Sequence, residues 1–101
     1  MKRRTQTRLF TVIMEYRGGT YISQVEAPDV VNALRAWSQQ LDPSEIAEFG
    51  PAHKRKLIQN IESDIENNEL PTPVQGTVNV WCAAATCRNS LMLIDIIQTE
   101  R

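Results

Sequence analysis

The sequence predicts a single α+β domain, in which two β-hairpins form a four-stranded, mostly antiparallel sheet and the helices between them pack on one face. Three observations predict this ββααββ order. Apolar and polar residues alternate on both sides of Gly18-Gly19, helix-like spacing runs from about residue 28 to residue 66, and two apolar runs flank "RNS" at 88–90. At 101 residues, the chain suits one domain covering 1–101, which can bury a core without metal or disulfide bonds.

The first hairpin begins with an alternating run from Leu9 to Arg17. Such alternation is typical of a strand with one buried face. Both residues of Gly18-Gly19 adopt positive φ without strain, which a two-residue type I′ turn requires. We therefore expect the turn at these glycines, with Tyr16 opposite Tyr21 and one apolar face continuing across both strands.

The middle of the chain carries helix signals. Pro28 ends the second strand and suits the first turn of a helix. Apolar residues then recur at helical spacing, at Val30, Leu34, Trp37 and Leu41. Asp42 is a candidate N-cap for a short helix that begins at Pro43, and a further helix is expected from about Ala52 to about Glu66. The segment "ENNELPTPVQG" is expected to be a loop, because its two prolines disfavour regular structure.

The second hairpin is apolar on both faces, which distinguishes it from the first. One face carries Val78, Val80, Cys82, Ala84, Leu91, Leu93, Asp95 and Ile97. The other carries Trp81, Ala83, Ala85, Met92, Ile94 and Ile96. Strands that are apolar on both sides are covered on both sides, and one layer of short helices covers only one of them. The remaining face therefore predicts contact with another protein chain.

This reasoning predicts both a core and an interface. The predicted core comprises Phe10, Val12, Met14, Val25, Leu34, Trp37, Leu57, Ile61, Val80 and Leu93. The predicted interface comprises Trp81, Met92, Ile94 and Ile96, because aromatic and methionine side chains are enriched in interface cores, and it also includes Asp95. The leading hypothesis is a non-enzymatic protein-binding module that either masks another protein or forms a homodimer.

Composition narrows the other classes of function. Eleven Lys and Arg against twelve Asp and Glu give a net charge of -1, which provides no overall attraction to nucleic acid or to a membrane. The single histidine, His53, stands in the polar stretch "PAHKRK", and we expect it at a solvated helix start. Cys82 and Cys87 are an odd number of residues apart on one strand, so they point to opposite faces and do not form a zinc site together. We expect no metal, no cofactor, no membrane span and a cytoplasmic location.

Asp95 is unusual among the acidic residues, because it lies within the apolar run "LMLIDIIQ". A carboxylate in such surroundings needs a partner. It is a structural acid with a hydrogen bond, a recognition group at the protein interface, or the centre of a small active site together with a neighbouring carboxylate or tyrosine. We expect that the protein is not an enzyme, and a small active site centred on Asp95 stays as an alternative.

A second alternative is nucleic-acid binding through residues 53–56, "HKRK", where Lys54, Arg55 and Lys56 adjoin one another. Residues 1–7 form an expected flexible tail that contributes further basic side chains. On a helix, however, the three consecutive cations spread around much of the circumference and do not form one stripe. The chain also has few aromatic residues for stacking on bases.

The stretch "YISQVEAPDVVNALRAW", with its early Ala33-Leu34, resembles the start of HicB-like antitoxins. The likeness of strand, turn, strand and helix covers about a third of the chain, and more broadly the chain is similar to small bacterial α+β antitoxin and immunity proteins. Three features depart from the family pattern: the second strand leads directly to Pro28, an extra helical region intervenes, and two strands close the chain. The resemblance implies a non-catalytic protein that masks a toxin.

Overall fold

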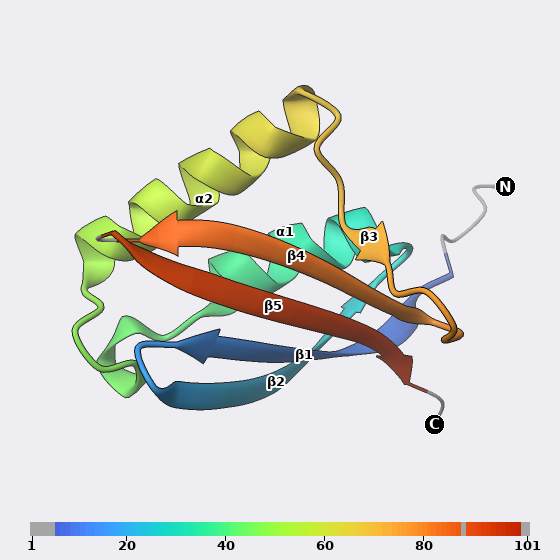
Figure 1. Cartoon of the computed structure of the whole chain (residues 1–101), viewed down its shortest axis with the longest axis horizontal. Helices are drawn as coiled ribbons and strands as arrows, with labels where there is room; N and C mark the ends of the chain where they lie inside the picture. Colours follow the sequence, from blue (N-terminus) through green and yellow to red (C-terminus); the bar gives the residue numbers. More distant parts are fainter. Residues whose placement is uncertain (1–5, 88, 100–101) are drawn as a thin grey trace, which may run out of the picture.

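The computed structural model describes residues 6–87 and 89–99. It is a five-stranded antiparallel sheet in the order β2-β1-β5-β4-β3 with its helices on one face (Figure 1), which confirms the α+β class and adds one short strand to the predicted four. The elements are β1 (Arg8–Tyr16), β2 (Gly19–Ala27), α1 (Val30–Gln40), the 3-10 helix η1 (Pro43–Glu45), α2 (Pro51–Glu66), β3 (Thr72–Pro73), β4 (Val80–Cys87) and β5 (Ser90–Thr99).

The first hairpin turns one residue earlier than predicted. Arg17 has φ 49° and Gly18 has φ 82°, so these two residues, and not Gly18-Gly19, form the turn. Tyr16 therefore pairs with Gly19, and Tyr21 pairs with Met14. A β-carbon at Gly19 would lie 2.6 Å from the Tyr21 hydroxyl, so a larger residue here would have to displace the end of that ring. The register moves by two residues, which leaves every side chain on its predicted face.

The helices begin at side-chain caps. Asp29, and not Pro28, precedes α1, and its carboxylate accepts a hydrogen bond from the backbone N–H of Asn32 at 2.8 Å. Asp42 caps η1 as predicted, accepting from the N–H of Ser44 at 3.0 Å. At the start of α2, the N–H of Gly50 donates to Nδ1 of His53 at 2.8 Å. These caps satisfy donors that the first turns of helices leave unpaired.

The two hairpins meet through β1 and β5, which pair antiparallel along almost their whole length. The faces of the second hairpin agree with the prediction, since Cys82 pairs with Asp95 and Ala83 pairs with Ile94. The loop prediction for the proline-containing segment was wrong in one place, where Thr72–Pro73 pairs with β4 as the short strand β3. Proline is tolerated there because an edge strand needs no donor on its outer side.

The core lies between the sheet and the helices. Eight of the ten predicted core residues are buried there: Phe10, Val12, Met14, Val25, Leu34, Trp37, Leu57 and Ile61. The core prediction was wrong for Val80 and Leu93, because both lie on the face of the sheet that turns away from α1 and α2. Leu93 is 44% exposed. In the described part of the chain, no helix is both long and apolar enough to cross a membrane.

Candidate functional site

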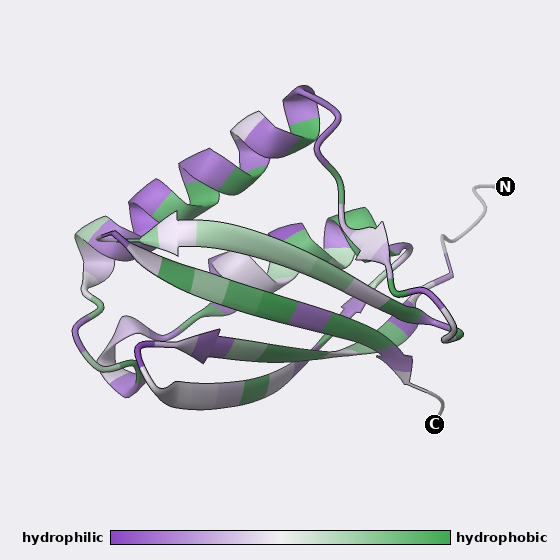
Figure 2. Cartoon of the chain, viewed as in Figure 1, coloured by the Kyte–Doolittle hydropathy of each residue, from purple (hydrophilic) through white to green (hydrophobic). Residues whose placement is uncertain are grey.

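The face of the sheet that turns away from both helices, here called the open face, faces the viewer in Figure 1. Green apolar residues continue along β5 and its neighbours in Figure 2. The apolar side chains of the open face are Leu9, Ile13, Ile22, Val80, Cys82, Ala84, Leu91, Leu93 and Ile97. Ile22 is 67% exposed and Leu91 is 59% exposed, so the single chain leaves much of this surface in water.

The predicted interface residues lie on the opposite face, and this part of the prediction was wrong. Met92, Ile94 and Ile96 are at most 1% exposed, and Trp81 is half-buried with its ring 6.2 Å from that of Phe10. The helices cover this face, so these four residues stabilise the core and do not present themselves to a partner. Asp95 alone of the predicted set lies on the open face.

The strand register arranges the open face in rows across the sheet. In one row, Ile22, Ile13, Asp95 and Cys82 follow one another from β2 to β4. In the next row, Thr20, Glu15, Leu93 and Ala84 do the same. Asp95 therefore has two apolar cross-strand neighbours, whereas Glu15 has Leu93 on one side and Thr20 on the other, at the short distances that antiparallel pairing imposes.

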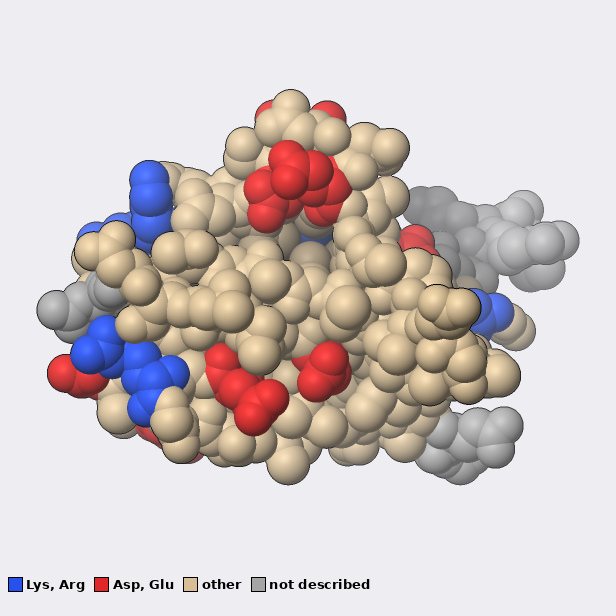
Figure 3. Space-filling view, viewed as in Figure 1, with Lys and Arg blue, Asp and Glu red and all other residues tan. Residues whose placement is uncertain are grey.

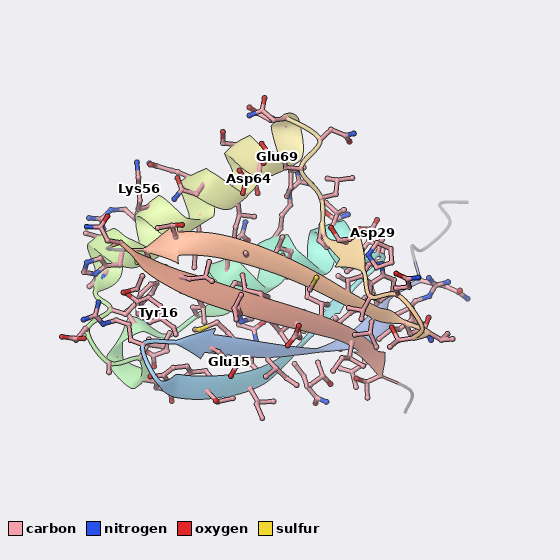
Figure 4. The ribbon with its side chains drawn as sticks, viewed as in Figure 1. Glu15, Tyr16, Asp29, Lys56, Asp64 and Glu69 are labelled. Atoms are coloured by element: carbon pink, nitrogen blue, oxygen red, sulfur yellow. The ribbon has the colours of Figure 1, made fainter. Side chains whose placement is uncertain are left out.

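The charges on this face are acidic. Glu15 is exposed and Asp95 is half-buried, and within the described residues no hydrogen bond or ion pair reaches either carboxylate. Figure 3 shows two small acidic groups within a broad uncharged surface, and Figure 4 shows Glu15 on this side of β1. Arg8 is the single basic residue described in the four long strands, and its pairing with buried Ala27 places it on the helix side.

The predicted nucleic-acid residues lie elsewhere. Lys54, Arg55 and Lys56 are in the first turns of α2 (Figure 4), beside the end of β1, where the rings of Tyr16 and Phe49 are 6.0 Å apart. Arg8 lies at the other end of β1, about 27 Å from Tyr16, because eight residue steps of a strand separate them. The basic residues of the predicted tail at 2–4 lie outside the described residues. Arg8 therefore forms no common patch with Lys54, Arg55 and Lys56.

The cysteines and the histidine take structural positions. Cys82 is exposed on the open face and Cys87 is buried on the helix side, as their odd spacing predicted. His53 is half-buried and caps α2, so the expectation of a simply solvated histidine was incomplete. No group of three His, Cys, Asp or Glu side chains that could hold a metal ion occurs in residues 6–87 and 89–99.

Three hollows of about 390, 430 and 240 Å³ mark the surface of the described residues. Asp95 lines none of them, and Glu15 lines the smallest, beside the first turn. Tyr16 lies on the helix side of the sheet, donates its hydroxyl to the Cys87 carbonyl at 3.5 Å, and has a pKa raised by burial. It therefore points away from Asp95, and the geometry does not pair these two residues.

Sequence reasoning missed Leu91, Leu93 and Glu15 as residues of the exposed surface. The sequence did contain a signal that these residues lie on the exposed side. Asp95 shares its face with both leucines, whereas the face of Met92 and Ile94 carries no charged residue. A single carboxylate marks the side that water or a partner reaches, because an unpaired charge is costly in a core.

No protein-family model, curated protein or solved structure gives a significant match to this chain. The resemblance to HicB-like antitoxins therefore stays a prediction. Any function assigned to the chain depends on the geometry of its own surface.

Proposed function

We propose that this chain is a non-enzymatic protein-binding module whose open face binds the apolar, basic surface of another protein. The observation that carries the proposal is an apolar surface across four strands on which Ile22, Leu91 and Leu93 are exposed. Within it, the carboxylates of Glu15 and Asp95 have no partner among the described residues. Contiguous exposed apolar surface of this kind marks interaction sites on soluble proteins.

The size of the open face suits this role. Four strands about 4.8 Å apart, each about eight residues long, cover on the order of 500 Å² before side-chain relief is counted. A standard interface buries about 800 Å² on each partner. The open face therefore supplies the larger part of a standard interface, and side-chain relief and the margins of the face have to supply the rest.

Charge favours a different protein over a second copy of this chain. If two open faces met, Glu15 and Asp95 would approach a surface on which no described strand residue is basic. Arg17, in the turn beside Leu91 and Leu93, is a cation at the margin of this face, and it is already engaged with Glu48 and Ser90. Like charges brought together in an interface cost several kcal/mol, on the order found when wrong partners are rejected. A partner with Lys or Arg side chains within an apolar patch satisfies both carboxylates, whereas a homodimer leaves them unpaired.

The proposed biological role is masking, as in small antitoxin and immunity proteins, in agreement with the resemblance of the hairpin and first helix to HicB-like antitoxins. Two free thiols, one of them exposed, agree with the expected reducing, cytoplasmic surroundings. Masking requires only tight coverage of the partner's working surface. Masking needs no catalytic group. The acidic open face offers a surface that can cover the partner in this way.

The test is a tagged pull-down from native lysate, with and without nuclease, combined with light scattering of the purified protein. We expect a stoichiometric protein partner that survives nuclease and has a basic surface. The double substitution Leu91→Ser with Leu93→Ser should abolish its capture. Val78→Ser is the matched control, because Val78 is 83% exposed yet lies outside the strands.

Three outcomes contradict the proposal. The first is capture of the partner by the double variant at the wild-type level. The second is a wild-type homodimer that the double variant converts to a monomer. The third is co-purified nucleic acid that nuclease removes, which would direct attention to Lys54, Arg55 and Lys56.

A further inference from the structure

The outer edge of β4 is paired over only part of its length. β3 covers Trp81 and Cys82, and the chain then leaves the sheet at Pro71 toward the end of α2 (Figure 1). If β3 continued in register, Leu70 would lie opposite Ala84. It does not continue, so the place beside Ala84 and Thr86 is without a neighbouring strand in the described chain.

The ladder shows which backbone groups point to this empty place. Antiparallel strands direct successive residues alternately toward one neighbour and the other. The N–H of Gln98 donates to the Asn79 carbonyl at 2.9 Å, so odd-numbered residues of this segment bond β5. The N–H of Val74 donates to the Val80 carbonyl at 2.9 Å, so even-numbered residues point outward. The outward N–H and C=O groups of Ala84 and Thr86 therefore have no partner among the described residues.

A hollow of about 430 Å³ lies beside this edge, between β4 and the C-terminal end of α2. Leu34, Ile61 and Ile94 contribute its apolar floor, and Ala83 and Ala84 contribute the sheet side. Of these two alanines, Ala83 points to the helix side of the sheet, and its small side chain leaves space below α2. Figure 3 shows the depression directly below a group of acidic side chains.

Those acidic side chains include Asp64 and Glu69, which both line the hollow and lie together at the end of α2 (Figure 4). Neither makes an ion pair within the described residues, and no Lys or Arg lines the hollow. Arg35 of α1 is engaged with Glu62 of α2 at 3.0 Å. The rim of the hollow is therefore negative, its floor is apolar and its side is an unpaired strand edge.

We infer that the free edge of β4 binds an extended segment of a partner protein as an added strand, with one long basic side chain in the hollow. The segment's backbone bonds the outward groups of Ala84 and Thr86, in line with β3. The methylene chain of its Lys or Arg packs on Leu34 and Ile61, and the cationic head reaches Asp64 and Glu69. This mode combines backbone bonds for affinity with a side-chain pocket for specificity.

The charge of the rim excludes the simplest alternative occupant, the β4 edge of a second copy. Such a copy would bring its own Asp64 and Glu69 next to the first pair. The inference does not rest on the open face, because the edge and the hollow are formed by other atoms. Binding at the edge can therefore fail while binding at the open face succeeds, or the reverse.

The test uses random twelve-residue peptides displayed on phage and selected on the full chain. We expect the enriched peptides to carry Lys or Arg between residues that favour strands. Adding a synthetic copy of one to ¹⁵N-labelled protein should slow hydrogen exchange at the Ala84 and Thr86 amides. Ala84→Pro removes the outward N–H and leaves the ladder to β5 intact, so it should weaken peptide binding by about tenfold.

The double substitution Asp64→Asn with Glu69→Gln tests the charge without touching the sheet and keeps the inference testable even where Ala84→Pro does not fold. We expect it to weaken basic peptides by about tenfold or more, as the loss of charge-assisted hydrogen bonds predicts. The controls are Glu66→Gln on the same helix and Thr20→Pro on the opposite edge strand, and both should bind as wild type. Failure to enrich any peptide overturns the inference, as does protection of other amides or unchanged binding by both variants.

Discussion

Glu15 of β1 pairs directly with Leu93 of β5, where the two hairpins join, so a carboxylate and an exposed leucine are cross-strand neighbours at the centre of the sheet. The next residue along β5, Ile94, points through the sheet into the core and is 1% exposed. Neighbouring residues of one strand therefore have different tasks. Stability and binding should be separable by substitution at adjacent positions.

The first prediction compares Ile94→Ala with Leu93→Ala. Ile94→Ala leaves a cavity below the helices, so it should lower the free energy of unfolding by about 2–5 kcal/mol. Leu93→Ala should lower it by less than about 1 kcal/mol, because that side chain is already partly in water. Urea denaturation measures both values. Equal losses at the two positions would mean that the open face is covered within the single chain.

A second prediction concerns the half-buried carboxylate of Asp95. It lies between Ile13 and Cys82 without a described partner, so Asp95→Leu should raise the free energy of unfolding by about 1 kcal/mol. The same substitution should weaken capture of a basic partner. Thr86→Leu is the control, because it adds apolar surface to the open face without removing a charge. A destabilised Asp95→Leu protein would show that the carboxylate has a structural role.

The third prediction uses the thiols to report on the two faces. An alkylating reagent should modify exposed Cys82 in the native protein, whereas buried Cys87 should react after denaturation only. Binding of a partner to the open face should slow the reaction of Cys82 by about tenfold or more at saturation. Mass spectrometry of the labelled peptides measures both rates. A Cys82 that stays equally reactive in the complex would place the partner elsewhere on the molecule.

The fourth prediction concerns alkaline pH. Burial raises the pKa of Tyr16 above its ordinary value, and the interaction with the Cys87 side chain acts in the same direction. The unfolded chain then releases this proton at lower pH than the folded chain does. The contribution of Tyr16 to stability is therefore complete below its unfolded pKa of about 10 and is lost as pH rises through the folded value.

Tyr16→Phe should remove this part of the pH dependence. As pH rises above about 10, the wild type should lose more unfolding free energy than the variant, as urea titrations at several pH values can measure. Parallel losses in the two proteins would show that Tyr16 ionises equally readily in both states.

Much of the fold followed from local patterns in the sequence. The alternation from Leu9 to Tyr16 sorted the β1 side chains between two faces, and the stripe of Leu57 and Ile61 located α2. Asp42 preceding Pro43 located η1, because a capping carboxylate and a proline both act on the turn that contains them. These signals depend on a few neighbouring residues and do not require knowledge of the rest of the chain.

The candidate site was less predictable. The sequence identified an uncovered apolar face on the second hairpin, but Trp81, Met92, Ile94 and Ile96 were assigned to it when they belong to the core. The edge at Ala84 was also not foreseen, because the length of β3 depends on where Pro71 leads the chain away. Asp95 was the local sign of the uncovered face, whereas the free edge leaves no trace in the local spacing of residues.

The sequence by itself determined which β4 and β5 side chains share a face, since a strand alternates with a period of two whatever surrounds it. Only the tertiary structure decided which of those faces is covered. Pairing of β1 with β5 continues the apolar surface of Phe10, Val12 and Met14 into Met92, Ile94 and Ile96, and the helices cover that whole surface. The physical reason is that both faces of the second hairpin are apolar, so the choice between them depends on contacts with residues far away in the chain.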